Sequence, residues 1–493
     1  MHSGVVDGLT WHAADGPHRL RDTVSAGSLL VEPGTLVCGG PGAALAVSEL
    51  VAEGAADETI VFTAEDPAEP WGGISASRMT ISHALLEHAL VAAQGRHISI
   101  RNTTIRRIQG QAAIFGGTGT GLMIEAVIDS ACLSLCPDSG SFGASVVVFY
   151  ATEFHFEDSQ ILNSGAGGLR VEWRSRIALL GGRIEGSSGI GLNLNEDPGG
   201  GRRVTLTDVR PIVITGGSSY PARIALEVAA TLLETREAQE GWMGNAADTV
   251  LVTSATSRAE NVTIHPGLAW AVYGGGPTSS PAQIASLELE PGASLQIRGP
   301  SGLTVGQLLS RGTSDAPVMI GSDTGTAARP TKLWLDGSEA PDTSRIEHTR
   351  FLGVRVEARF PVVFEDVTVN EGDIVVSAEG SRLTSFRLIG SHEHADAALT
   401  IAASNVQVDL CEITGSARDG VRVDVAAGVR ISECNIEGNA GVGVRNLAAE
   451  VVDAGSVWWG DPQGPHAPEG DGVAGSVDFL PFLLQPVNVG FAF

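Results

Sequence analysis

The chain contains the same sequence pattern twice. Residues 28–34 read SLLVEPG and residues 286–292 read SLELEPG, so these two segments match at an offset of 258 residues. A second match, between residues 154–171 and 406–423, has an offset of 252 residues. Because the two offsets nearly agree, the sequence predicts that one architecture is built twice along the chain.

A shorter repeat of 23 residues lies within each half. The shift pairs Ile161 with Ile184 and Leu169 with Leu192 in the first half, and Ile413 with Ile436 and Val421 with Val444 in the second. A unit this short cannot bury its apolar face alone, so it must stack on its neighbours. We therefore expect a solenoid of two modules, residues 1–265 and 266–493.

Apolar and polar residues alternate within each repeat, as where Leu169 and Val171 flank Arg170. A period of two residues is typical of a strand with one buried face, and Gly, Asn, Asp and Ser separate these segments as turns require. The expected fold is all-β, a parallel β-helix of about 20 rungs in which the residues paired by the shift form buried ladders. Only residues 223–240 depart from the pattern, as a short helix or two irregular strands.

The charge of the chain restricts its partners. It has 57 acidic and 31 basic residues and a net charge of −26, so nucleic acid is not an expected partner. The same charge would repel an anionic polysaccharide unless calcium bridged the two, and calcium is the one cofactor left open. An acidic surface also favours a monomer. No apolar run reaches 18 residues, so we expect no membrane-spanning segment.

The chain has five cysteines, an odd and sparse set that is no disulfide framework. Cys411 and Cys434 stand 23 residues apart, at equivalent positions of adjacent repeats. They could form a disulfide or remain stacked thiols in the core. Because free cysteine often behaves as a small buried apolar residue, we expect the free thiols.

Three segments resemble a known group of proteins. They are LLVEPGTLV at residues 29–37, DETIVFTAEDPAEPWGGI at 57–74 and VVDAGSVWWGDPQGP at 451–465. The chain is similar in these segments to bacterial right-handed parallel β-helix repeat proteins of pectate-lyase-like architecture, although Val457 stands where those proteins usually have Asn. The resemblance implies a right-handed helix and export to the cell surface or beyond. It implies no single function, since this architecture serves enzymes, adhesins and spacers.

One outward position of the repeat carries arginine. Arg170, Arg422 and Arg445 occupy it, and Glu172 and Asp424 follow the first two of them after two residues. A row of guanidinium groups could bind sugar hydroxyls or carboxylates. The same row is also expected of an ordinary solvated face with surface ion pairs.

Two segments contain residue types that bind metal ions. His392, His394 and Asp396 would share a face if their segment is extended, which suits zinc or a similar ion; the alternative is a polar turn. The acidic loop at residues 195–197 could bind calcium through oxygen ligands. Glu347 and His348 are adjacent, so we expect their side chains to point to opposite faces, one of them inward.

No ordered set of catalytic residues stands out in the chain. We therefore expect a non-catalytic extracellular scaffold or binding protein whose partner is a polysaccharide or another cell-surface component. The alternative is a polysaccharide lyase or glycoside hydrolase that acts along one face through a carboxylate such as Glu157, Glu172 or Glu185.

Overall fold

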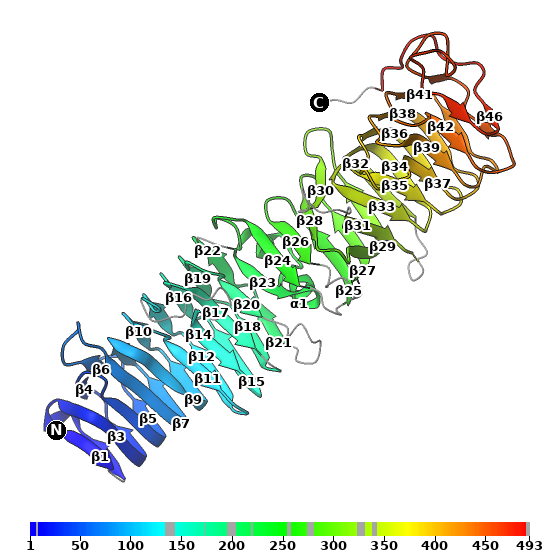
Figure 1. Ribbon diagram of the computed structural model, residues 1–493. Helices are drawn as coiled ribbons and strands as arrows, with labels where there is room; N and C mark the ends of the chain where they lie inside the picture. Colours follow the sequence, from blue (N-terminus) through cyan, green and yellow to red (C-terminus); the bar gives the residue numbers. More distant parts are fainter. Residues whose placement is uncertain are drawn as a thin grey trace. The chain divides into compact units, whose positions relative to one another are not determined.

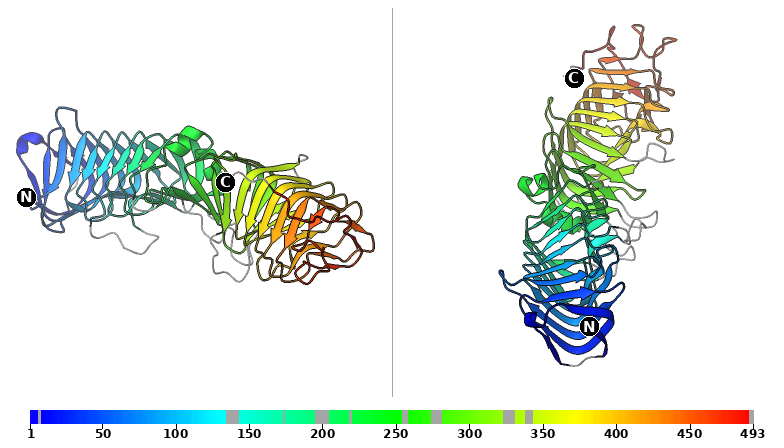
Figure 2. Two further views of the ribbon diagram at one scale, coloured as in Figure 1. Left: turned by 90° about the horizontal axis from the view of Figure 1, so that it is seen from above. Right: turned by 90° about the vertical axis from the view of Figure 1, so that its left-hand side faces the viewer.

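The chain is described by a computed structural model that divides into two compact units, Met1–Leu251 and Val252–Phe493. Figure 1 and Figure 2 show short strands lying side by side in layers within each unit. The description covers residues 1–5, 8–133, 143–172, 174–194, 204–217, 220–253, 258–273, 281–322, 331–337 and 343–489. The division that the repeat places at residue 265 stays a prediction.

The first unit is a stack of rungs whose strands pair in parallel with the rungs before and after them. We name its layers sheets 1, 2 and 3 in the order in which the chain passes through them. Four long strands bend and contribute to sheets 1 and 2: β3 (His18–Val31), β5 (Ala44–Glu53), β7 (Trp71–Ser82) and β9 (Ala89–Arg101). The first residues of β3 also pair with sheet 3. β1 (His2–Val5) and β2 (Leu9–Trp11) pair with β3.

The remaining strands of the first unit each belong to one sheet. Sheet 1 continues through β11 (Ala113–Gly116), β14 (Ala144–Phe149), β17 (Gly167–Glu172), β20 (Leu192–Leu194) and β23 (Ala222–Ala225). Sheet 2 continues through β12 (Thr120–Ile124), β15 (Glu153–Glu157), β18 (Arg176–Leu180) and β21 (Thr205–Arg210). Sheet 3 contains β4 (Leu36–Gly39), β6 (Ile60–Ala64), β8 (Ala84–Glu87), β10 (Thr104–Arg106), β13 (Val127–Asp129), β16 (Gln160–Leu162), β19 (Arg183–Glu185) and β22 (Val213–Thr215).

The second unit repeats this three-sheet plan. β25 (Arg258–Ile264), β27 (Ala282–Leu289) and β29 (Leu303–Arg311) bend from sheet 1 into sheet 2. β32 (Ser344–Leu352), β34 (Val362–Asn370), β36 (Arg382–Ile389) and β38 (Gln407–Thr414) bend from sheet 2 into sheet 3. Sheet 1 continues through β31 (Thr331–Leu335), β33 (Val354–Ala358), β35 (Asp373–Val376), β37 (Ala397–Ile401), β39 (Asp419–Val423), β42 (Val444–Asn446) and β45 (Val473–Ala474).

The other strands of the second unit complete sheets 2 and 3. Sheet 2 ends in β40 (Arg430–Ser432), β43 (Val452–Asp453) and β46 (Val477–Asp478). Sheet 3 includes β26 (Ala269–Tyr273), β28 (Ser294–Arg298), β30 (Val318–Ser322), β41 (Cys434–Glu437) and β44 (Val457–Trp458). The fold is an all-β parallel β-helix solenoid, as the repeat predicts.

The strand register confirms the 23-residue repeat. Ile161 pairs with Ile184, Leu169 with Leu192, Ile413 with Ile436 and Val421 with Val444. The residues expected to form core ladders are at most 1% exposed; they are Ile161, Ile184, Leu192, Ile413, Ile436 and Val444. Apolar burial of this kind is the main favourable contribution to folding of such a stack.

The longer duplication also holds at the level of register. Leu45 and Leu50 of β5 pair with Val24 and Leu29 of β3. At the offset of 258 residues, Leu303 and Leu308 of β29 pair with Ala282 and Leu287 of β27. The two units therefore build this pair of rungs in the same way.

The segment at residues 223–240 contains two short α-helices. α1 spans Leu226–Leu232 and buries Leu226 and Val228, and α2 spans Arg236–Glu240. The side chain of Thr235 caps α2 by accepting a hydrogen bond from the backbone N–H of Ala238. Of the two alternatives for this segment, the helical one is therefore correct.

Among the residues that the structure describes, no helix is long and apolar enough to cross a membrane.

Cys411 and Cys434 form a disulfide between β38 and β41, with their Cα atoms 4.3 Å apart. The expectation of free thiols is wrong. The parallel register stacks the two residues directly above one another, which brings the sulfur atoms within bonding reach. The pairing links two adjacent rungs of the second unit covalently.

The tryptophan segment that resembles a closing element packs at the end of the second unit. Trp459 is fully buried, and Trp458 lies in β44, which pairs with β41. The indole N–H of Trp458 donates a hydrogen bond to Oε2 of Glu437 at 3.0 Å. The closing role that the resemblance implies for this segment stays a prediction.

Candidate functional site

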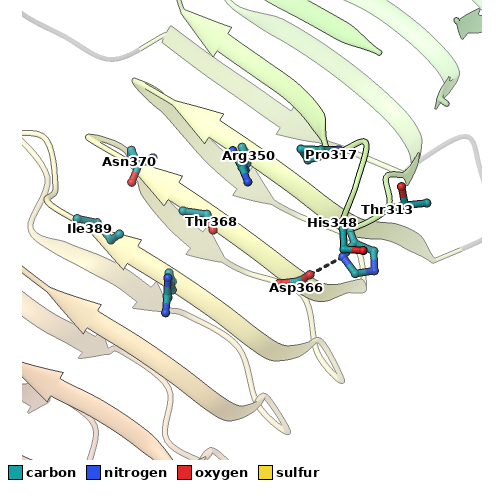
Figure 3. Close-up of a pocket in the computed structure, with 10 residues that line it drawn as sticks. Thr313, Pro317, His348, Arg350, Asp366, Thr368, Asn370 and Ile389 are labelled. Atoms are coloured by element: carbon teal, nitrogen blue, oxygen red, sulfur yellow. Dashed lines mark ion pairs between the residues drawn. The ribbon is translucent and has the colours of Figure 1, made fainter. Parts of the chain in front are cut away.

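One corner of the second unit presents polar side chains in a row. β32 and β34 each bend between sheets 2 and 3 at one residue with positive φ, His348 at 42° and Asp366 at 54°. His and Asp adopt this left-handed conformation more readily than most residues. Nδ1 of His348 and Oδ2 of Asp366 form a close ion pair (Figure 3).

The bend also corrects the expectation for Glu347 and His348. We predicted that one of the two side chains would point inward, but both are partly exposed. The left-handed residue interrupts the strand alternation on which that prediction depends. The inward positions on either side are occupied by Ile346 and Thr349, which are fully buried.

Beyond the corner, two columns of side chains run across the outer face of sheet 3. Arg350, Thr368 and Arg387 form the first column, since the strand register pairs Arg350 with Thr368 and Thr368 with Arg387. The second column contains Asn370 and Ile389. Phe351 and Val369 alternate with these residues and are fully buried, so the outward direction of the columns is set by the core.

A loop between β29 and β30 forms a wall beside these columns. Thr313 and Pro317 of this loop lie beside the strands that carry Arg350 and Thr368 (Figure 3), and Ser314 lines the same space. The loop is held by backbone hydrogen bonds between Thr313 and Ala316 in both directions. Together the loop, corner and columns enclose a hollow of about 220 Å³. We call it the sheet 3 hollow.

The sheet 3 hollow contains a cation that no described acid neutralises. Arg387 has its Nε 2.8 Å from Oε2 of Glu412, and Asp366 is paired with His348. Arg350 is exposed and makes no side-chain hydrogen bond or ion pair with any residue that the structure describes. Its guanidinium group is therefore available to an oxyanion from solvent.

The arginines predicted from the repeat lie on sheet 1 instead. Arg422 has Nε 2.8 Å from Asp424 and NH1 2.9 Å from Asp396. Arg445, in the next rung, holds Asp419 with two hydrogen bonds, one of 3.0 Å from NH2 to Oδ1. The structure thus brings these residues together as ion pairs within the protein. The binding role predicted for the row stays a prediction.

Arg170 and Glu172 differ from the other members of the predicted row. Arg170 is 3% exposed and Glu172 7% exposed, and Nε of Arg170 donates to Oε1 of Glu172 at 2.8 Å. The expectation that Arg170 faces solvent like Arg422 is wrong. Its strand position points away from the apolar core, as predicted, but the residue is covered at that position.

The predicted metal ligands do not come together. Asp396 is bound to Arg422, while the rings of His392 and His394 lie 5.2 Å apart and the backbone N–H of His394 donates to Nδ1 of His392. Among the described residues, no group of three or more His, Cys, Asp or Glu side chains is placed to hold a metal ion. The acidic segment at residues 195–197 lies outside the described residues.

The three candidate catalytic carboxylates lie on three different sheets. Glu157 ends β15 in sheet 2 and faces Arg210 at 3.2 Å; Glu172 lies in sheet 1; Glu185 lies in sheet 3, 3.3 Å from Arg183. Each is paired with an arginine. No two of them share a face on which they could act on one glycosidic bond.

A more buried charged network lies on the outer side of sheet 1 in the second unit. Oε1 and Oε2 of Glu357 accept hydrogen bonds from Lys332 and from the indole N–H of Trp334, at 2.9 and 2.8 Å. Burial alone raises the pKa of Glu357, but these hydrogen bonds and Arg355 outweigh it and hold the pKa below its usual range. Burial raises the pKa of the neighbouring Asp373 although Arg355 lies 2.7 Å away.

Sequence reasoning missed Arg350, Thr368 and Asn370. Together with Arg387 and Ile389, these residues lie in segments that read EHTRFLG, EDVTVNE and TSFRLIG at residues 347–353, 365–371 and 384–390. These segments share a corner residue followed by outward positions two and four residues later. Their spacings of 18 and 19 residues depart from the 23-residue repeat, so an alignment at 23 does not superimpose them.

Neither a comparison with models of known protein families nor a comparison with curated proteins finds a match to this chain.

Proposed function

We propose that the chain is an extracellular parallel β-helix binding protein with pectate-lyase-like architecture, and that the sheet 3 hollow binds an acidic group of a glycan or another cell-surface component. One observation carries this proposal. Arg350 lies at the floor of the hollow and makes no pair with a described acid, in a chain whose net charge is −26. A guanidinium group in this setting favours a carboxylate or sulfate ligand.

The other lining residues suit a sugar. Thr313, Ser314 and Thr368 offer hydroxyl groups, Asn370 offers an amide, and Ile389 offers a small apolar surface. Such a mixture of few polar groups and apolar contact is typical of a small-ligand site. The volume of about 220 Å³ lies below the range of drug-sized pockets, so it suits one sugar unit of a longer chain.

The disulfide supports the extracellular part of the proposal. Disulfides such as Cys411–Cys434 form and persist in oxidising compartments, and they are rare in the cytosol. The resemblance of the opening and closing segments to exported β-helix proteins points the same way. We propose that the chain acts as a monomer, because its acidic surface disfavours self-association.

The proposal is tested by titrating the full chain with hexamers of galacturonate, sulfated heparin-derived hexasaccharides and neutral hexasaccharides in a calorimeter. We expect an acidic oligosaccharide to bind equally well with calcium and with EDTA, since Arg350 supplies the charge. Arg350→Gln should weaken binding roughly tenfold or more. The matched control is Arg430→Gln, an exposed arginine of sheet 2 outside the hollow. Equal binding by Arg350→Gln and by the unchanged chain would contradict the proposal.

A further inference from the structure

The outer face of sheet 2 in the first unit carries a second hollow, of about 360 Å³. Five consecutive rungs contribute to it through β5, β7, β9, β12 and β15. We call it the sheet 2 hollow. Neither the 23-residue repeat nor the arginine row pointed to it.

The strand register places one column of exposed side chains along the sheet 2 hollow. Glu49 pairs with Arg78, Arg78 with His97, and Thr120 with Glu153. The pairing of Ile98 with Gly121 aligns His97 with Thr120 and completes the column. With rungs about 4.8 Å apart, the column spans roughly 19 Å, which is long enough to contact several sugar units. Leu50, Met79 and Ile98 follow these residues inward and are at most 2% exposed, so the core fixes the outward direction of the column.

The polar groups of this face are only partly used within the protein. Nδ1 of His97 lies 3.3 Å from Oγ1 of Thr120, and Nε2 of His155 lies 2.9 Å from Oε1 of Glu153. Glu49 and Arg78 are exposed and make no side-chain hydrogen bond or ion pair with a residue in the described part of the chain. An acceptor and a donor in adjacent rungs are therefore open to a ligand.

The charge of the sheet 2 hollow differs from that of the sheet 3 hollow. Arg78 is opposed by the two carboxylates of Glu49 and Glu153, so a carboxylate or sulfate ligand would be disfavoured. A sugar hydroxyl both donates and accepts hydrogen bonds, which matches Glu49, Arg78 and the hydroxyl groups of Thr80 and Ser99. Leu122 adds a small apolar surface for the C–H face of a sugar ring.

We infer that the sheet 2 hollow is a separate binding site for a neutral, hydroxyl-rich glycan, so that one chain binds two chemically different glycans at once. The inference rests on the proposed function for the acidic site, and it adds a second ligand class and a second location. Two sites on one chain would link an acidic and a neutral polymer, with a gain in avidity wherever both are present.

The test uses the full chain and calorimetric titration with cellohexaose, maltohexaose and xylohexaose. We expect one of these neutral probes to bind, and Arg78→Gln and Glu49→Gln each to weaken its binding roughly tenfold. Arg183→Gln, an exposed arginine of sheet 3 in the same unit, is the matched control and should leave it unchanged. Arg350→Gln should also leave it unchanged. In a second assay, the chain held on an immobilised neutral glycan should capture the acidic hexamer.

The outcomes separate this inference from the proposed function. If the acidic hexamer binds through Arg350 but neutral probes do not bind, or bind with no effect of Arg78→Gln and Glu49→Gln, the second site is refuted and the acidic site stands. If Arg350→Gln abolishes the binding of both ligand classes, there is one site only. If no oligosaccharide of either class binds, both proposals fail.

Discussion

His348 at the corner of one rung forms an ion pair with Asp366 at the same corner of the next rung. Both residues have positive φ, so each side chain leaves the strand outside the alternating pattern. The pair closes one end of the sheet 3 hollow beside Arg350 (Figure 3). The two left-handed residues thus set both the path of the chain at the corner and the polar groups at this end of the hollow.

The left-handed conformation of His348 predicts that a β-branched substitution lowers stability more than a substitution by Asn. His348→Val places a β-branched residue in the left-handed region and should lower the free energy of unfolding by about 1–3 kcal/mol. His348→Asn should cost less than about 1 kcal/mol, because Asn tolerates this conformation and the lost ion pair is partly exposed. Chemical denaturation of both variants measures the difference. Equal stability of the two variants would contradict the role given to the corner.

The buried ladders predict large effects from small deletions. Ile436→Ala should lower the free energy of unfolding by about 2–5 kcal/mol, because Ile436 is fully buried and stacks on Ile413. Leu352→Ala is the control: Leu352 is 48% exposed on the outer face, so its loss should change stability by less than about 0.5 kcal/mol. Denaturant titrations measure both losses in the free energy of unfolding. A loss for Ile436→Ala as small as that of its control would contradict the register of β38 with β41.

The disulfide predicts a redox dependence of stability in the second unit. Cys411 and Cys434 close a loop across 23 residues, so replacing both with Ala should lower the free energy of unfolding by about 3 kcal/mol. Peptide mapping without reductant should recover the two cysteines in one linked peptide pair. Recovery of both cysteines as free thiols from the native protein would show that the rungs are not cross-linked.

Asp419 predicts acid sensitivity of the second unit. Burial raises its pKa, but hydrogen bonds from Arg445 and from the backbone N–H of Val442 outweigh burial and lower the pKa overall. A carboxyl group whose folded-state pKa is lowered stabilises the fold above its unfolded-state pKa, and this contribution is lost as pH falls through the folded-state pKa.

We therefore expect Asp419→Asn to be less stable than the unchanged chain at pH 7, by about 1.5–3 kcal/mol for a charge-assisted hydrogen bond. The difference should shrink as pH falls below about 4, where the unchanged chain loses the same contribution. Unfolding free energies measured across this range check the sign. A difference that grew with acidity would show that the ion pair with Arg445 does not depress the pKa of Asp419.

The sequence predicted the fold better than the site for a physical reason. The ladder of Ile161 and Ile184 repeats because every rung must bury the same face, so its period is visible in one sequence. Arg350, Thr368 and Arg387 have no such requirement, and they follow one another at spacings of 18 and 19 residues rather than 23. Only the register of β32, β34 and β36 shows that these side chains share a face.

The disulfide and the buried Arg170 illustrate the same limit. A shift of 23 residues correctly placed Cys411 beside Cys434, but residue spacing does not tell a bonded pair from stacked thiols. Arg170 occupies the outward position that the alternation predicted, yet it is 3% exposed. Alternation predicts the direction of a side chain and not what covers it.

The most direct test of ligand binding in the sheet 3 hollow is amide hydrogen exchange of the full chain with and without a bound acidic hexasaccharide. If the sheet 3 hollow is the binding site, exchange should slow in the loop at residues 313–317 and in peptides that contain the corners at His348 and Asp366. Arg350→Gln should remove this protection at the same ligand concentration. Protection confined to other segments, with no change at residues 313–317 and at these corners, would contradict the central claim.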